Sequence, residues 1–167
     1  MSGKVLVVMG SDSDWKVMSA AAETLRSYDV DIDVQVASAH RVPDKVSEMS
    51  AKARENGFSV IIAGAGAAAH LAGVLASKTT LPVIGVPLSG TALQGVDALY
   101  ATVQMPSGIP VATVAIDGAR NAALLAIQIL AVSDERLAAR LAGDKQDLYT
   151  QIEEKNQKVR ELAGLSG

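Results

Sequence analysis

The sequence predicts an α/β fold, a three-layer sandwich in which helices cover both faces of a five-stranded parallel sheet. Short apolar runs rich in valine and isoleucine alternate with longer segments whose apolar residues recur at helical spacing. Such alternation favours parallel strands joined by right-handed crossovers. The first run, KVLVVM at 4–9, is apolar on both faces, as expected of a strand that is covered on both sides.

Four further segments are expected to be strands because each is short, β-branched and mainly apolar. IDVQVA at 32–37 alternates apolar and polar residues, whereas FSVIIAG at 58–64 is almost continuously apolar. PVIGVP at 82–87 and PVATVAI at 110–116 complete the predicted sheet.

The segments between the strands are expected to be helices. Residues 14–27 place Met18, Ala22 and Leu25 on one helical face, and a second amphipathic helix opens at Pro43 and ends near Gly57. Further helices are expected at 68–77, 93–103 and 119–131. The last of these is apolar nearly all round, so it should be buried on several sides.

The chain is expected to form a single domain, 1–167, with its core at 1–131 and a helical extension at 132–167. The extension is too polar to be core, yet apolar residues recur in it at helical intervals. They are Leu137, Leu141, Leu148, Ile152, Val159 and Leu162. These C-terminal helices are therefore predicted to pack on a neighbouring subunit.

The composition excludes some classes of function and favours self-association of the chain. A net charge of −3, a pI near 5.3 and only five aromatic residues argue against a nucleic-acid-binding surface. No segment is apolar for long enough to span a membrane, and no signal peptide is evident, so a cytoplasmic protein is expected. Between 79 and 133 only Asp97, Asp117 and Arg120 are charged, which favours a homo-oligomer because small domains leave much of their surface exposed.

Polar loops follow the first two predicted strands, where parallel sheets bind ligands. In GSDSD at 10–14 the glycine permits a tight turn, and free amides at the following helix would attract a phosphate. Its aspartates suit ribose hydroxyls or an amino group, although an ordinary helix N-cap is the simpler interpretation. In SAHR at 38–41, Arg41 offers a fork of donors to phosphate or carboxylate, and His40 can titrate near neutral pH. Structural roles for this pair remain an alternative.

The loop after the third strand, AGAGAAAHLAG at 63–73, is glycine- and alanine-rich. Gly64 and Gly66 would allow close backbone approach to a flat ligand, and His70 is expected in the first turn of the next helix, neutral and hydrogen-bonded. Tight packing of a buried helix would explain the small residues nearly as well. Two other loops, 87–93 and 104–110, could close over a ligand.

Several chemistries lack their signatures. The glycine loop matches neither the dinucleotide-binding nor the Walker pattern. The two histidines could meet, but neither His-x-x-x-His nor His-Glu-x-x-His spacing occurs, and cysteine is absent, so no metal site is predicted. No Gly-x-Ser-x-Gly elbow suggests a serine hydrolase. The residues alone thus predict a phosphate-binding α/β site with one or two imidazoles.

Taken in order, these segments resemble the PurE family of N5-carboxyaminoimidazole ribonucleotide mutases over the chain from the first strand to about Ala131. The segments that carry the resemblance are GSDSDW, SAHRVPD, AGAGAAAHLAG, PVIGVP, GVDALYATVQMPSGIPVATVAI and NAALLAIQIL. The family is similar to flavodoxin-like proteins in topology, so a flavodoxin-like sheet is expected.

The resemblance implies a step of de novo purine biosynthesis. N5-carboxyaminoimidazole ribonucleotide would become 4-carboxy-5-aminoimidazole ribonucleotide through decarboxylation and recarboxylation. His40 would act as the general acid and base, while His70 and the amides of 64–70 would hold the CO2 and the carboxylate. The implied substrate-binding residues are Ser11, Asp12, Asp14, Ser38, Arg41, Gly64, Gly66, Ala67 and Leu71.

The resemblance also implies the absence of cofactors, an octameric assembly, and a functional link to the synthetase that makes the carbamate substrate. This chain has Val42, Ala67, Ala72 and Val74 where the family commonly has threonine, glycine, proline and methionine. Two alternatives remain open: a carboxylase of the same family that uses CO2 directly, and a non-catalytic flavodoxin-like module that binds a mononucleotide. The carboxylase class typically lacks the histidine at position 70, so His70 favours the mutase.

Overall fold

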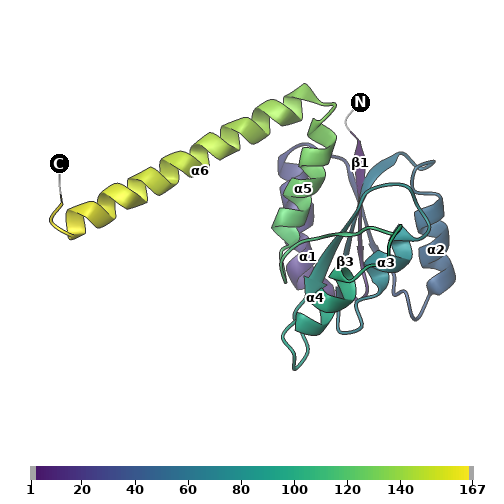
Figure 1. The fold of residues 1–167 in the computed structure, drawn as a ribbon. Helices are drawn as coiled ribbons and strands as arrows, with labels where there is room; N and C mark the ends of the chain where they lie inside the picture. The colour runs from purple at the N-terminus through teal and green to yellow at the C-terminus, as the bar shows by residue number, and fades with distance from the viewer. Residues whose placement is uncertain (1–2, 166–167) are drawn as a thin grey trace.

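The computed structural model describes residues 3–165, and it confirms the predicted five-stranded parallel sheet with helices on both faces (Figure 1). The strand order is β2-β1-β3-β4-β5, and all pairs are parallel. The strands span β1 Lys4–Met9, β2 Ile32–Val36, β3 Phe58–Gly66, β4 Val83–Leu88 and β5 Ala112–Thr113.

The helices alternate with the strands along the chain. A short 3-10 turn, η1 (Asp12–Asp14), leads into α1 (Trp15–Ser27). The remaining helices are α2 Pro43–Ala51, α3 Leu71–Ala76, α4 Val96–Val103, α5 Ala119–Ala131 and α6 Glu135–Leu162. No helix in the described range 3–165 is both long and apolar enough to cross a membrane.

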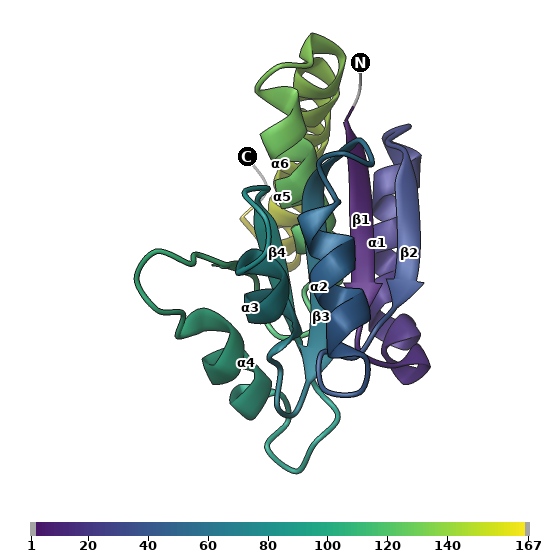
Figure 2. The same ribbon diagram turned by 90° about the vertical axis from the view of Figure 1, so that its right-hand side faces the viewer.

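Two hydrophobic cores lie on the two faces of the sheet. Alternate residues of β1 divide between them, because successive strand side chains point to opposite faces. Val5 and Val7 pack with α1 and α5, whereas Leu6 and Val8 pack with α2 and α3. Figures 1 and 2 show the two helical layers on either side of the sheet, and α4 packs against β4, next to the edge strand β5. This arrangement leaves the carboxyl ends of the strands free of covering helices.

Some element boundaries differ from the prediction for identifiable reasons. The helix after β3 begins at Leu71, because Ala67 has φ +52° and two tight turns follow, from Ala69 N–H to the Ala67 carbonyl and from His70 N–H to the Ala68 carbonyl. The helix after β4 begins at Val96, because Gln94 and Gly95 both adopt positive φ. The expected strand at 110–116 shrinks to two residues.

The segment after β5 still follows β4, although its hydrogen bonds are too irregular for a strand. Val114 N–H donates to the Gly85 carbonyl at 3.1 Å, and Asp117 N–H donates to the Pro87 carbonyl at 2.9 Å. The chain is thereby carried to the carboxyl end of β4, where Asp117 lies next to the cavity-lining loop described below.

The C-terminal extension is one continuous helix, α6, rather than several helices, and it extends away from the sandwich (Figure 1). Its first turns are attached to the body: Leu137 is buried, Tyr28 donates a hydrogen bond to Asp144, and Arg140 forms an ion pair with Asp29 at 3.3 Å. Beyond these contacts its apolar side chains are exposed. They are Leu148, Tyr149, Ile152, Val159 and Leu162.

Candidate active site

A cavity of about 690 Å³ lies at the carboxyl ends of β1, β2, β3 and β4, where a parallel sheet is expected to bind its ligand. Its walls come from four segments of the chain: 10–17, 38–41, 65–71 and 88–91. The first three include the loops that the sequence predicts to bind a ligand. Eight of the predicted site residues line the cavity: Ser11, Asp14, Ser38, His40, Arg41, Gly66, Ala67 and Leu71.

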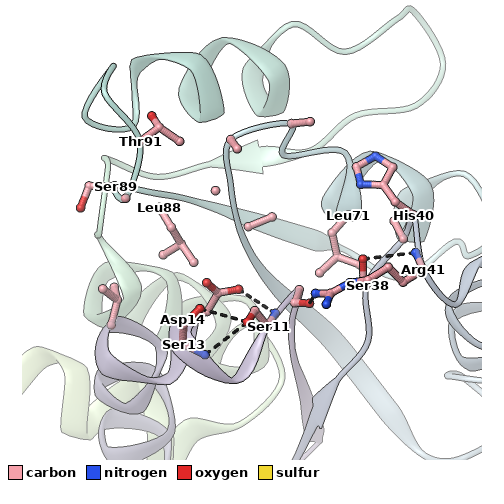
Figure 3. A pocket seen from close by; sticks show the side chains of 18 of the residues that line it. Ser11, Ser13, Asp14, Ser38, His40, Arg41, Leu71, Leu88, Ser89 and Thr91 are labelled. Atoms are coloured by element: carbon pink, nitrogen blue, oxygen red, sulfur yellow. Dashed lines mark hydrogen bonds between the residues drawn. The ribbon is translucent and has the colours of Figure 1, made fainter.

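The segment after β1 is held by its own side chains. Ser11 caps the short turn by accepting from Ser13 N–H at 3.4 Å, and the Asp14 carboxylate accepts from Ser11 N–H at 2.9 Å (Figure 3). Burial raises the pKa of the Asp14 carboxyl, against the opposing effect of hydrogen bonds from the Ser11 and Gly10 amides. Asp12 was expected to bind substrate, but its exposed side chain accepts from the Ser11 hydroxyl at 3.0 Å and does not line the cavity.

Arg41 links the second loop to the first. Its Nη2 donates to the Gly10 carbonyl at 3.1 Å, and its own backbone N–H donates to the Ser38 hydroxyl at 3.3 Å (Figure 3). The guanidinium therefore lies beside the Ser11 turn. Because one Arg41 N–H group is committed to Gly10 and a guanidinium has five, several donors remain for an anionic ligand.

The two histidines of the chain meet at the mouth of this site. His40 Nε2 lies 2.9 Å from His70 Nδ1, and the rings are 5.0 Å apart at an angle of 78°. One of these nitrogens must carry the shared proton. His40 lines the cavity; His70 does not, and it immediately precedes α3 instead of lying in the helix's first turn. His70 thus reaches the cavity through its contact with His40, and its role toward CO2 and the carboxylate stays a prediction.

The glycine-rich loop after β3 divides into a packing part and a cavity-lining part. A Cβ atom on Gly64 would lie 2.4 Å from Met18 Sδ, so this glycine is required for close approach of α1 to the sheet, and it does not line the cavity. Gly66, Ala67 and Ala68 do line it. The space beside the Gly64 α-carbon is filled by Met18, so this glycine serves packing, and its contact with the ligand stays a prediction.

The fourth wall is formed by Leu88, Ser89, Gly90 and Thr91. It contains no predicted site residue, although loop 87–93 is one of the two loops expected to close over a ligand. Its position after the fourth predicted strand was the signal that could have identified it. Lys16 and Ser13 also line the cavity and were not predicted. Within residues 3–165, no three His, Asp or Glu side chains are grouped so that they could hold a metal ion.

Known proteins resemble this chain over most of its length. A family model described as AIR carboxylase matches residues 4–151. The N5-carboxyaminoimidazole ribonucleotide mutase of Pyrococcus horikoshii is 51% identical over 156 residues, covering 93% of this chain and 88% of the relative. The enzyme of that name from Escherichia coli K12 is 57% identical over 140 residues, covering 83% of each chain.

A solved structure extends the likeness to three dimensions. The crystal structure of Treponema denticola PurE superimposes with a TM-score of 0.86 at 26% identity, covering 94% of this chain and 98% of that one. The family model, the relatives and the shared fold together establish that this chain belongs to the AIR carboxylase family, the PurE proteins.

Proposed function

We infer that this protein is an N5-carboxyaminoimidazole ribonucleotide mutase of de novo purine biosynthesis. The observation that carries the inference is the placement of His40 on the wall of a cavity that also presents Arg41 and Ser11, with His70 only 2.9 Å from His40. Curated relatives that bear the mutase name are 46–57% identical over most of the chain. The reaction converts the N5-carbamate into the 4-carboxylate of the same ribonucleotide.

Arg41 and the Ser11 turn are proposed to bind the phosphoribosyl part of the substrate. A guanidinium suits a phosphate because its donors match two phosphate oxygens at once. Ser11, Ser13 and Ser38 bring three hydroxyl groups to the same side of the cavity. Asp14, which shares this wall, is suited to accept hydrogen bonds from ribose hydroxyls and not to meet the phosphate itself.

His40 is proposed to move one proton in each half of the reaction. As an imidazolium it protonates the carbamate nitrogen; the bond from that nitrogen to the carboxyl carbon then breaks, its electron pair stays on nitrogen, and CO2 is released. Carbon 4 of the ring, made electron-rich by the free amine, attacks the CO2 and forms the new carbon–carbon bond. Neutral His40 then removes the proton from carbon 4, which restores the aromatic ring and the imidazolium.

Two groups are proposed to assist this cycle. The N–H groups of Ala67 and Ala68 have no acceptor among residues 3–165 and belong to the cavity wall, so they are available to hold CO2 and the carboxylate. His70, whose Nδ1 meets His40 Nε2, would fix the orientation and tautomer of His40 rather than touch CO2 itself. Retention of CO2 in the site is needed as well, because general acid–base catalysis raises the reaction rate by only about 10²–10⁴-fold.

The assembly is proposed to be a homo-octamer of a single cytoplasmic domain, linked in function to the synthetase that makes the carbamate. Support comes from α6, whose exposed apolar residues beyond Asp144 have no partner surface among residues 3–165, and from the exposed side chains of Val96, Tyr100 and Val103 along α4. Light scattering after size exclusion tests this. The double substitution Leu148→Lys, Ile152→Lys should reduce the molar mass of the particle, and an unchanged mass would contradict packing through α6.

The function itself is tested by the choice of substrate. Purified protein is supplied in parallel with the carbamate substrate and with aminoimidazole ribonucleotide plus bicarbonate at low concentration. A mutase converts the carbamate efficiently and uses the second mixture poorly. Efficient turnover of aminoimidazole ribonucleotide at low bicarbonate would instead identify a carboxylase, and no turnover of either would contradict both enzymes in favour of a binding module.

A further inference from the structure

The β4–α4 loop, residues 89–95, forms a wall of the cavity to which the mechanism above gives no role. Ser89, Gly90 and Thr91 line the cavity, and Figure 3 shows Ser89 and Thr91 across it from His40 and Arg41. This separation follows from the strand order, since β1 and β3 lie between β2 and β4. The loop is therefore placed to contact the substrate from the side of the cavity opposite Arg41.

One end of this loop is fixed by Asp117. Its Oδ1 accepts from Ser89 N–H at 2.9 Å, and its Oδ2 accepts from the Ser89 hydroxyl at 2.5 Å. Asp117 has φ +57°, a left-handed conformation that aspartate adopts more readily than most non-glycine residues. Its own N–H donates to the Pro87 carbonyl at 2.9 Å. The exposed Asp117 carboxylate thus bonds both the backbone N–H and the hydroxyl of Ser89.

The other end is fixed by Asp97. The Thr91 hydroxyl donates to the two oxygens of Asp97 at 3.1 and 3.0 Å, and Leu93 N–H donates to that hydroxyl at 3.2 Å. Neither the Ser89 nor the Thr91 hydroxyl points at His40 or Arg41 in Figure 3, because each serves as an anchor. The loop therefore contributes backbone groups to the cavity wall, because these two hydroxyl groups are already hydrogen-bonded to carboxylates.

Gly90 lies between the two anchored residues. It has φ +149°, and a Cβ atom built on it would meet no protein atom within 4 Å, so open space lies beside its α-carbon. The N–H groups of Gly90 and Thr91 have no acceptor within residues 3–165. Unpaired backbone donors at the wall of a cavity are suited to an anionic oxygen of a ligand.

We propose that Asp117 is a positioning residue for the mutase reaction: through Ser89 it holds the β4–α4 loop so that the Gly90 and Thr91 amides donate to an anionic oxygen of the substrate. The inference rests on the proposed function. The oxygen belongs either to the phosphate or to the migrating carboxyl group. Without the anchor the loop samples other conformations, and the apparent affinity falls by the fraction that remains competent.

The decisive variant is Asp117→Gly, which removes the carboxylate while glycine accepts the left-handed φ without strain. We expect the dissociation constant of the product, measured calorimetrically, and KM of the substrate to rise about tenfold, as for loss of hydrogen bonds to a charged group. Turnover at saturating substrate should stay within about twofold of wild type, because bound substrate restores the competent loop. Asp31→Gly, at an exposed aspartate with no role in the cavity wall, is the matched control and should leave KM unchanged.

Two companion variants separate positioning from general stability. Asp117→Asn tolerates the same φ, can accept from Ser89 N–H and can donate to the Ser89 hydroxyl, so it should restore most of the affinity lost in Asp117→Gly. Ser89→Ala keeps the hydrogen bond from the residue 89 N–H to Asp117, so it should raise KM less than Asp117→Gly does. This effect should disappear in the Asp117→Gly background, because the Ser89 hydroxyl acts through the Asp117 carboxylate.

Binding measurements with two ligands, the product and aminoimidazole ribonucleotide, identify which oxygen the loop binds. If Asp117→Gly weakens the product and aminoimidazole ribonucleotide equally, the phosphate is the partner; if it weakens only the product, the carboxyl group is. A wild-type KM in Asp117→Gly, a loss confined to turnover, or full additivity with Ser89→Ala would overturn the proposal while leaving the proposed function intact. A wild-type protein that neither converts the carbamate nor binds its product would overturn both.

Discussion

Replacement of Gly64 by alanine tests whether this residue serves packing or substrate binding. The added Cβ would lie 2.4 Å from Met18 Sδ, 2.9 Å from its Cγ and 3.0 Å from its Cε, whereas ordinary contacts begin at 3.4 Å. The sulfur must therefore retreat by about 1 Å (3.4 − 2.4 Å). Because three consecutive atoms of a fully buried side chain are too close, Met18 must repack within the filled core or α1 must shift away from the sheet.

The expected cost is that of overpacking a filled core, about 1–3 kcal/mol in the free energy of unfolding. Because the Ser11–Asp14 turn leads directly into α1, the same shift should displace it and lower kcat/KM by up to about 10²-fold. Urea denaturation gives the first quantity and steady-state kinetics the second. Gly143→Ala in α6, where an added Cβ meets nothing within 4 Å, is the control and should be neutral or stabilising.

The Met18→Ala background provides the internal check. Met18→Ala alone should cost about 2–5 kcal/mol through the cavity it leaves, but Gly64→Ala should then add little, because the space beside residue 64 is vacant. Equal destabilisation by Gly64→Ala in both backgrounds would refute the packing explanation. Loss of substrate affinity at unchanged stability would show instead that Gly64 contacts the ligand, as the sequence alone predicted.

Three further predictions concern single residues. Arg41→Ala should raise KM about 10–100-fold, because it removes a charged hydrogen-bond partner of the substrate. Arg54 bonds Thr80 outside the cavity, so Arg54→Ala is the control and should leave KM unchanged. A normal KM in Arg41→Ala would exclude a role for Arg41 in substrate binding. Burial raises the pKa of Asp14 above its ordinary value of 3.8, so the native state holds this proton more tightly than the unfolded chain. The free energy of unfolding of wild type, relative to Asp14→Asn, should therefore be greatest below that value and should decline as the pH rises through the raised pKa. Urea denaturation from about pH 3 to about pH 6 measures this difference, and an increase with pH would contradict the prediction. Ala67→Gly should stabilise the fold by up to about 1 kcal/mol, because glycine relieves the strain of φ +52°; a lower urea midpoint would contradict this.

The architecture could be predicted from sequence because it depends on patterns that local residues carry. Runs such as 4–9 and 58–64 are apolar on both faces, and only a sheet covered on two sides buries them. The errors occur where hydrogen bonding depends on distant partners. Whether residues 110–116 form a strand depends on their fit to β4, and only Ala112 and Thr113 pair regularly with it.

The candidate site was predictable to a similar extent. The rule that ligands lie at the carboxyl ends of parallel strands selected the segments of Ser11, Arg41 and Gly66, and all three residues line the cavity. It could not distinguish Gly64, which packs against Met18, from Gly66, which lines the cavity, because a glycine has no side chain to indicate its surroundings. Nor could spacing reveal the contact between His40 and His70, which requires the folded positions of two separate loops.

The proton transfer assigned to His40 is the central claim, and His40→Asn tests it most directly with the carbamate substrate. Asparagine preserves polarity and approximate size but cannot exchange a proton near neutral pH. Product affinity should remain within a few-fold of wild type, while kcat should fall by about 10²–10⁴-fold. Turnover at the wild-type rate in this variant would contradict the assignment of His40 as the general acid and base.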